Sequence, residues 1–97
     1  MLTLEITDQA EADIEEIYLY IAVESYQSYA ESFASKVFKT FDLLCHNPQM
    51  GTERIGSGEG VRFYPMDRGN IFYRVVSDRL QILRVYHSAL DSDRLRL

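Results

Sequence analysis

The chain has 97 residues, 46% of them hydrophobic, and a formal net charge of -5. This length suits one domain over residues 1–97, and Cys45, the only cysteine, allows neither a disulfide nor a zinc site with His46. No apolar run reaches the roughly 20 residues of a membrane span, and the N-terminus lacks the basic start of a secretory signal. We therefore expect a soluble, cytoplasmic protein without metal or cofactor.

Charge is distributed unevenly along the sequence. Residues 1–53 carry ten acidic side chains against two lysines, whereas residues 54–97 carry eight arginines against five acidic side chains. An acidic chain is a poor candidate for direct nucleic-acid binding, because neutralised phosphates supply most of that affinity. Arginines instead suit planar contacts to carboxylates. A protein partner is the expected target.

The first half predicts a short strand and two helices. Residues 2–6 alternate apolar and polar, and Asp8 with Glu11 resembles a capping box at the start of a helix. An apolar stripe follows, and the acidic residues mark the opposite, solvent-facing side. The stripe consists of Ala10, Ile14, Ile17, Tyr18, Ile21 and Ala22, and the acidic side of Glu11, Asp13, Glu15 and Glu16.

The second helix follows a polar break at residues 24–28. Its apolar positions again recur at helical spacing, and Pro48 and Gly51 end it. These positions are Ala30, Phe33, Ala34, Val37, Phe41 and Leu44. A core role explains both stripes better than a cofactor site, because a two-layer domain needs such faces. The glycine-rich residues 56–60 lack the signature of a phosphate loop and indicate a flexible link.

Three runs of β-branched and aromatic residues fill the second half, at residues 61–64, 71–76 and 80–86. The connections between them are too short for a crossover helix, so the runs should pair as an antiparallel meander. Arg62, Arg74 and Arg84 each lie on one of these strands. Each arginine has two interpretations: a partner contact, or a side chain that covers apolar surface or pairs with a helix carboxylate.

In this order, the elements resemble the ParE/RelE superfamily of toxins from type II toxin–antitoxin modules. The resemblance rests on the apolar spacing of both helices, Asn47-Pro48, Gly51 and the strand segments Val61-Arg62, Ile71-Arg74 and Leu83-His87. It implies an α+β fold of order β-α-α-β-β-β, in which an antiparallel helical hairpin packs on a mainly antiparallel sheet. The other sheet face would be a concave surface.

The resemblance implies two possible activities. In the RelE-like branch, the toxin cleaves mRNA on the ribosome, and His87, Arg62 and Arg84 would be its catalytic residues here. That branch usually has an arginine where this chain has Asn70. In the ParE-like branch, the toxin binds DNA gyrase and needs no catalytic residues. The sequence fits the ParE-like branch better, with an mRNA interferase and a degenerate toxin that only binds its antitoxin as alternatives.

The resemblance also implies a ParD-like antitoxin that forms a hetero-oligomer with the toxin. The candidate partner-binding residues are Arg62, Arg74, Arg84, Leu90, Arg94 and Leu95. They combine charged and apolar side chains on the strands and the C-terminal tail, a mixture typical of protein interfaces. Period-two alternation places Arg84 and His87 on opposite sheet faces unless the strand ends or bulges between them.

Overall fold

The structure, a computed structural model, describes residues 1–56, 58–88 and 90 of the chain. It has an α+β fold of two helices and a sheet of order β1-β5-β4-β3-β2. The elements are β1 (Thr3–Ile6), α1 (Asp8–Glu24), α2 (Gln27–His46), β2 (Thr52–Glu53), β3 (Arg62–Met66), β4 (Gly69–Val76) and β5 (Arg79–His87).

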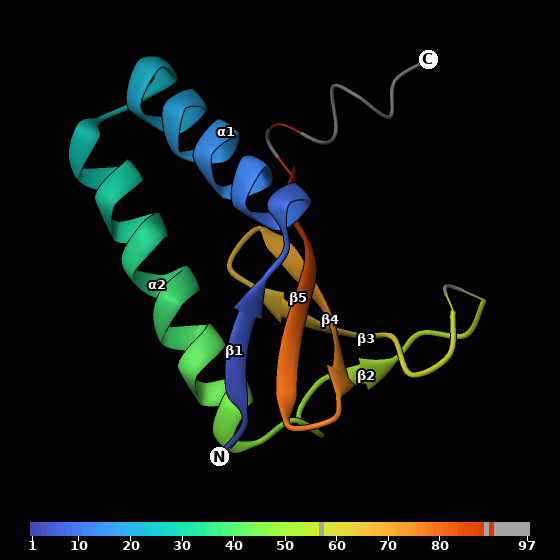
Figure 1. The fold of residues 1–97 in the computed structure, drawn as a ribbon. Coiled ribbons are helices and arrows are strands. Elements are labelled where there is room, and N and C mark those ends of the chain that lie inside the picture. Colours follow the sequence, from blue (N-terminus) through green and yellow to red (C-terminus); the bar gives the residue numbers. More distant parts are fainter. Residues whose placement is uncertain (57, 89, 91–97) are drawn as a thin grey trace.

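The helical hairpin lies against one face of the sheet, as predicted (Figure 1). The predicted antiparallel meander is β3, β4 and β5, and β1 pairs in parallel with β5. The two-residue strand β2, which pairs with β3, was not predicted. Two residues are too few to carry a readable alternation pattern. Neither helix in the described part of the chain is long and apolar enough to cross a membrane.

The start of α1 corrects the predicted capping box. Thr7, not Asp8, is the N-cap residue, and its Oγ1 accepts a hydrogen bond of 3.2 Å from the backbone N–H of Ala10. The same hydroxyl donates to the backbone oxygen of Ile82 on β5 at 2.8 Å. Thr7 therefore begins the helix and fixes it to the sheet, a tertiary contact that local sequence pattern does not reveal.

The core lies between the hairpin and the sheet. Its fully buried members come from both helices and from the two central strands, and include Ala10, Ile17, Val37, Phe41, Leu44, Ile71, Tyr73, Leu80 and Ile82. Asp13 corrects the predicted solvent-facing side of α1, because it is buried at 7% exposure. Tyr18, Ile21 and Ala22, which were predicted on the apolar stripe, are only partly buried.

A β-bulge in β5 determines which side chains face the helices. Phe72 pairs with Arg84 and Tyr73 pairs with Ile82, so Leu83 is an extra residue on β5. Buried side chains accordingly switch from Leu80 and Ile82 before the bulge to Val85 and His87 after it. Arg84 and His87 lie on opposite faces, as predicted, but the bulge precedes both of them.

Candidate functional site

The sheet face turned away from the helices carries aromatic rings and arginines. Phe63 lies opposite Phe72, and their ring centroids are 6.1 Å apart. Phe72 also meets Tyr86 edge-on at 5.2 Å. The guanidinium of Arg54 lies 4.9 Å from the centroid of Phe72, and that of Arg84 lies 5.2 Å from the centroid of Tyr86. We call these five residues the basic aromatic face.

Arginine over an aromatic ring is a favourable arrangement, worth about 0.5–1 kcal/mol at an exposed site. Aromatic residues and arginine are also the types most enriched at the centres of protein interfaces. The face lies over three strands of the sheet, so its side chains are held on a rigid support. It is therefore suited to bind a partner that supplies apolar and acidic groups.

Arg84 is anchored by Asp13 of α1 across the edge of the sheet. Its Nε and Nη2 donate to the two carboxylate oxygens of Asp13 at 2.8 and 3.0 Å. The backbone N–H of Val85 donates to the same carboxylate at 3.0 Å. Because β1 ends at Ile6, no strand within the described residues pairs with this side of β5 beyond the bulge. Asp13 thus accepts a hydrogen bond from the backbone at the edge of β5 and also holds Arg84, an arginine of the basic aromatic face, in place.

Arg74 extends the same face toward the β4–β5 turn. Its Nε donates to Oε1 of Gln81 at 2.7 Å, and Gln81 donates in turn to Glu5 at 2.6 Å. Glu5 also pairs with Arg79. Within the described residues, Arg74 has no carboxylate partner, so its guanidinium is free to meet one from another protein.

Arg62 does not belong to the basic aromatic face. It lies opposite Tyr73 on β4, whose side chain points to the helices, and its Nη1 donates to the backbone oxygen of Gly51 at 2.7 Å. The hydroxyl of Tyr73 accepts from Gly51 N–H and donates to Pro48 oxygen, both at 2.8 Å. Burial raises the pKa of Tyr73. Arg62 and Tyr73 together fix the segment that follows α2.

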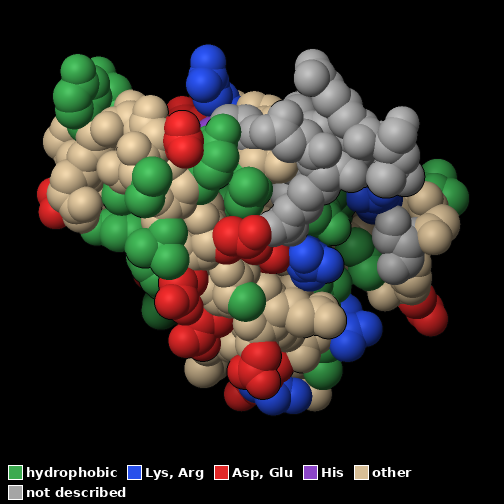
Figure 2. All heavy atoms as spheres, turned by 90° about the horizontal axis from the view of Figure 1, so that it is seen from above, with side chains coloured by type: hydrophobic (Ala, Val, Ile, Leu, Met, Phe, Trp, Pro, Cys, Tyr) green, Lys and Arg blue, Asp and Glu red, His purple; other side chains and the backbone are tan. Residues whose placement is uncertain are grey.

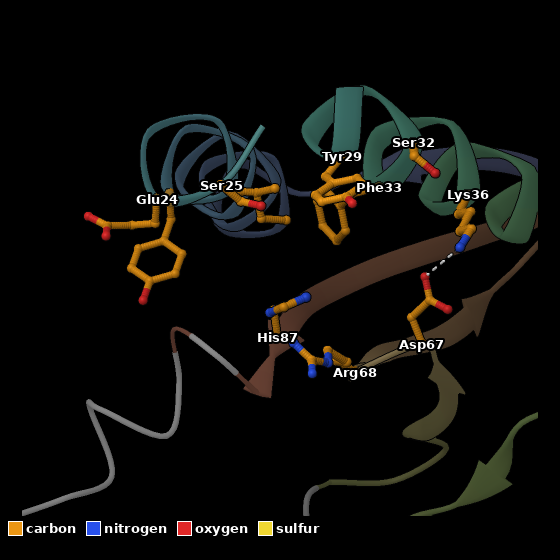
Figure 3. A pocket seen from close by; sticks show the side chains of 11 residues that line it. Glu24, Ser25, Tyr29, Ser32, Phe33, Lys36, Asp67, Arg68 and His87 are labelled. Atoms are coloured by element: carbon orange, nitrogen blue, oxygen red, sulfur yellow. Dashed lines mark hydrogen bonds and ion pairs between the residues drawn. The ribbon is translucent and has the colours of Figure 1, made fainter. Parts of the chain in front are cut away.

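His87 lies at the far end of the sheet, on the helix side (Figure 3). It is buried, and its ring meets Phe33 of α2 edge-on at 5.8 Å. A cavity of about 640 Å³ opens here between the hairpin and the β3–β4 turn, with Ile21 and Phe33 among its apolar lining. Lys36 pairs with Asp67 across it at 3.1 Å.

The three residues that a ribonuclease would use are not brought together. Arg62 and His87 both face the helices, but they lie opposite Tyr73 and Gly69. These positions are four residues apart on β4, or about 13 Å along the strand. Arg84 lies on the other face. In the described part of the chain, no cluster of metal-ligating side chains was found either.

The remaining predicted partner-binding residues lie near the C-terminus of the chain, and only one of them is among the described residues. Leu90 is partly buried and packs against the core. Arg94 and Leu95 lie outside the described residues. Sequence reasoning missed Asp13 and Arg54. Asp13 stands three residues after Ala10 and four before Ile17, so its spacing placed it on the apolar stripe although its charge did not. Nothing in the sequence marks Arg54, because it comes from a connecting segment.

Comparisons with known proteins agree with this architecture. The family model for the ParE toxin of the type II toxin–antitoxin system parDE matches residues 4–91. A chain of the chromosomal ParDE toxin–antitoxin system from P. aeruginosa is 25% identical, with a TM-score of 0.77 over 90% of this chain and 96% of that one. No curated protein matches the sequence.

A second solved structure has the same fold at a lower sequence identity. A chain of the RelBE2 toxin–antitoxin complex from Mycobacterium tuberculosis has a TM-score of 0.66 and covers 89% of this chain and 96% of its own length. At 21% identity, this likeness concerns the fold alone.

Proposed function

This chain belongs to the ParE toxin family of type II toxin–antitoxin systems, and on that premise we propose that it inhibits DNA gyrase by binding and is neutralised by a cognate ParD-like antitoxin. The observation that carries the proposal is the separation of Arg62, Arg84 and His87. Cleavage of RNA needs a base, an acid and fixed positive charge around one phosphate. Three side chains on two faces do not supply that arrangement.

An inhibitor that acts by binding needs a rigid surface, and the basic aromatic face is such a surface. Its rings pack against one another, and Asp13 fixes the guanidinium of Arg84. The formal net charge of -5 also favours a protein contact over a direct contact with nucleic acid.

Neutralisation by an antitoxin has support from the same surface. Arg74 and Arg54 are exposed on it, and neither has a carboxylate partner in the described part of the chain. A disordered antitoxin segment that folds on the toxin can supply carboxylates for these arginines and apolar side chains for Phe63 and Phe72. One of the similar structures comes from the chromosomal ParDE toxin–antitoxin system of P. aeruginosa, and this supports an antitoxin as the partner.

The test is a DNA supercoiling assay with purified gyrase and toxin, run beside a cleavage assay on ribosome-bound message. We expect lost supercoiling, intact message, and restored supercoiling when the antitoxin is added. Cleaved message with unaffected gyrase would favour the RelE-like mRNA interferase. Neither effect, together with tight antitoxin binding and no growth arrest, would identify a degenerate toxin.

A further inference from the structure

The cavity beside His87 has a volume of about 640 Å³ and lies between the hairpin and the β3–β4 turn. Figure 3 shows His87 and Arg68 on its sheet side, with Tyr29 and Phe33 of α2 directed toward them. Ile21 of α1 adds further apolar surface. A hollow of this size, with an apolar lining and a few polar groups, suits a ligand or a short chain segment.

Two charged side chains at the cavity have no partner among the described residues. Arg68 follows Asp67 in the β3–β4 turn, and its guanidinium takes part in no ion pair or hydrogen bond within the described part of the chain. Glu24 ends α1, and its carboxylate is likewise unpaired there. Asp67, by contrast, is paired with Lys36 at 3.1 Å. The cavity thus offers an unpaired cation on the sheet side and an unpaired anion on the hairpin side.

The hairpin side of the cavity includes an acidic helix. Residues 8–24 of α1 contain no lysine or arginine. Figure 2 shows acidic side chains gathered in a band on the visible face, with most of the visible basic side chains to one side of it. An occupant should therefore bring positive charge to the hairpin side and negative charge to Arg68.

The chain leaves the sheet at this cavity. His87, the last residue of β5, lines it, and the backbone N–H of Ser88 donates to the backbone oxygen of Arg68 at 2.6 Å. Leu90 then packs against the core. Residues 91–97 lie outside the described residues, and seven residues can span about 23 Å when extended. The walls of the cavity are therefore within reach of this segment.

The sequence of residues 91–97 complements the cavity in both charge and order. The segment consists of Asp91, Ser92, Asp93, Arg94, Leu95, Arg96 and Leu97. Its carboxylates come first, near the point where the chain passes Arg68, and its arginines follow, farther along toward Glu24. In an extended segment the two leucines share one side and the two arginines share the other. The leucines can therefore cover the apolar lining while the arginines lie at the acidic side.

We propose that residues 91–97 dock in this cavity in the free toxin, with an aspartate against Arg68, the leucines on the apolar lining and an arginine against Glu24. Covalent connection favours this occupant over a separate peptide, because a short connecting segment gives an effective concentration in the millimolar range. Weak individual contacts are therefore enough to hold the segment in place.

Docking controls whether the segment is available to a target, and this step rests on the proposed inhibition of gyrase. Residues 91–97 cannot contact the cavity and a target protein at the same time. Binding of the target must therefore release the segment, so the apparent affinity for the target is reduced to the extent that the segment is docked. The free toxin is thereby partly self-inhibited.

The first test is a disulfide between the segment and the cavity wall in the full-length toxin. Ser32→Cys places a thiol on α2 at the cavity, and Ser92→Cys places one in the segment. Gentle oxidation should link this pair in about tenfold higher yield than the control pair Ala12→Cys/Ser92→Cys. Ala12 is exposed on α1 beside Asp13, which bonds to Val85 of β5, so the control thiol is within reach but outside the cavity. Equal yields would assign the cavity to another occupant and overturn the inference.

The second test reverses one charge of the cavity. Cys45 does not interfere, because it is buried and burial raises the pKa of its thiol. Arg68→Glu, added to the Ser32→Cys/Ser92→Cys toxin, should lower the disulfide yield about fivefold at low ionic strength, where charge contributes most. Arg74→Glu makes the same charge change on the outer sheet face and should lower the yield less than about twofold. Equal effects of the two reversals would refute the contact with Arg68.

The same disulfide tests the consequence for gyrase. The oxidised Ser32→Cys/Ser92→Cys toxin should inhibit supercoiling about tenfold less than the same toxin after reduction. Equal inhibition by the two forms would refute the regulatory role of the segment. Failure of the parent toxin to inhibit gyrase would instead refute the proposed target, and the disulfide yields would still decide whether the segment docks.

Discussion

Asp13 of α1 and Arg84 of β5 form a two-point ion pair that joins the hairpin to the edge of the sheet. The side chain of Asp13 is 8% exposed and that of Arg84 is 36% exposed. The pair is therefore neither a free surface ion pair nor a fully buried one. Its carboxylate also accepts a hydrogen bond from the backbone N–H of Val85, which lies beyond the end of the β1–β5 pairing.

Replacement of Asp13 by alanine should be strongly destabilising. The variant leaves the N–H of Val85 and one side of Arg84 without their acceptor, and we expect the free energy of unfolding to fall by about 3 kcal/mol. Denaturant unfolding measures this loss. Arg79→Ala, which breaks the exposed pair with Glu5, is the control and should cost less than about 1 kcal/mol. Similar losses in both variants would contradict a special role for Asp13.

The sequence predicted the two helices and the three-stranded meander because their apolar positions repeat over many residues. Such repeats follow from burial of one face and hardly depend on any single side chain. Asp13, Thr7 and Leu83 were not predictable in the same way. The first two act through contacts with β5, more than 65 residues later in the sequence. The bulge at Leu83 reverses the facing of His87 without any local signal.

The candidate site was only partly predictable for the same reason. Sequence alone places Arg62, Arg74 and Arg84 on strands, but their faces depend on register and on the bulge. The observed register places Arg62 on the helix side of the sheet, and Arg54 lies over Phe72 on the outer face. The arginines thus serve different purposes, although their sequence contexts are similar.

Tyr73 should make stability depend on pH at the alkaline end. Its pKa is raised above the ordinary value of 10.0, mainly by burial, so the folded protein holds the phenolic proton more tightly than the unfolded chain. The stabilisation is complete below about pH 10 and is lost as the pH rises through the raised pKa of the folded state. Urea unfolding between pH 8 and pH 11 should therefore show a falling free energy of unfolding above about pH 10.

Tyr73→Phe separates this effect from general alkaline unfolding. The variant loses the hydrogen bonds to Pro48 and Gly51, and we expect a cost of about 2 kcal/mol at neutral pH. Its free energy of unfolding should fall less steeply above pH 10, because the buried titrating group is gone. An unchanged slope would assign the alkaline loss to the other tyrosines.

Arg74 gives the cleanest test of antitoxin contact on the sheet. It is exposed and bonds only to Gln81 among the described side chains, so Arg74→Ala should leave thermal stability nearly unchanged. If an antitoxin carboxylate is buried against it, affinity should fall by on the order of 2 kcal/mol. Arg62→Ala and Arg84→Ala complete the set, but both also remove structural contacts. Unchanged antitoxin binding in all three variants would exclude the sheet as the interface.

Variants at Asn70 and His87 distinguish a binding toxin from a nuclease. Asn70→Ala changes a half-buried side chain opposite Tyr86, and toxicity should stay nearly intact. His87→Ala should also remain toxic. Because this variant loses the packing of His87 against Phe33, its melting temperature is measured alongside. Loss of toxicity in His87→Ala at an unchanged melting temperature, together with cleaved message in cells that express the parent, would establish the ribonuclease instead.

Truncation of the C-terminal tail, residues 88–97, tests whether the toxin acts by binding its target. Its sequence mixes acidic, arginine and leucine residues, which suits a protein interface. Removal of residues 88–97 should abolish toxicity, but it also removes Leu90 from the core and should lower the melting temperature. Removal of residues 91–97 keeps Leu90, so lost toxicity at a nearly parental melting temperature would show that the tail contacts the target. Full toxicity in the shorter truncation would confine the target contact to residues 1–90.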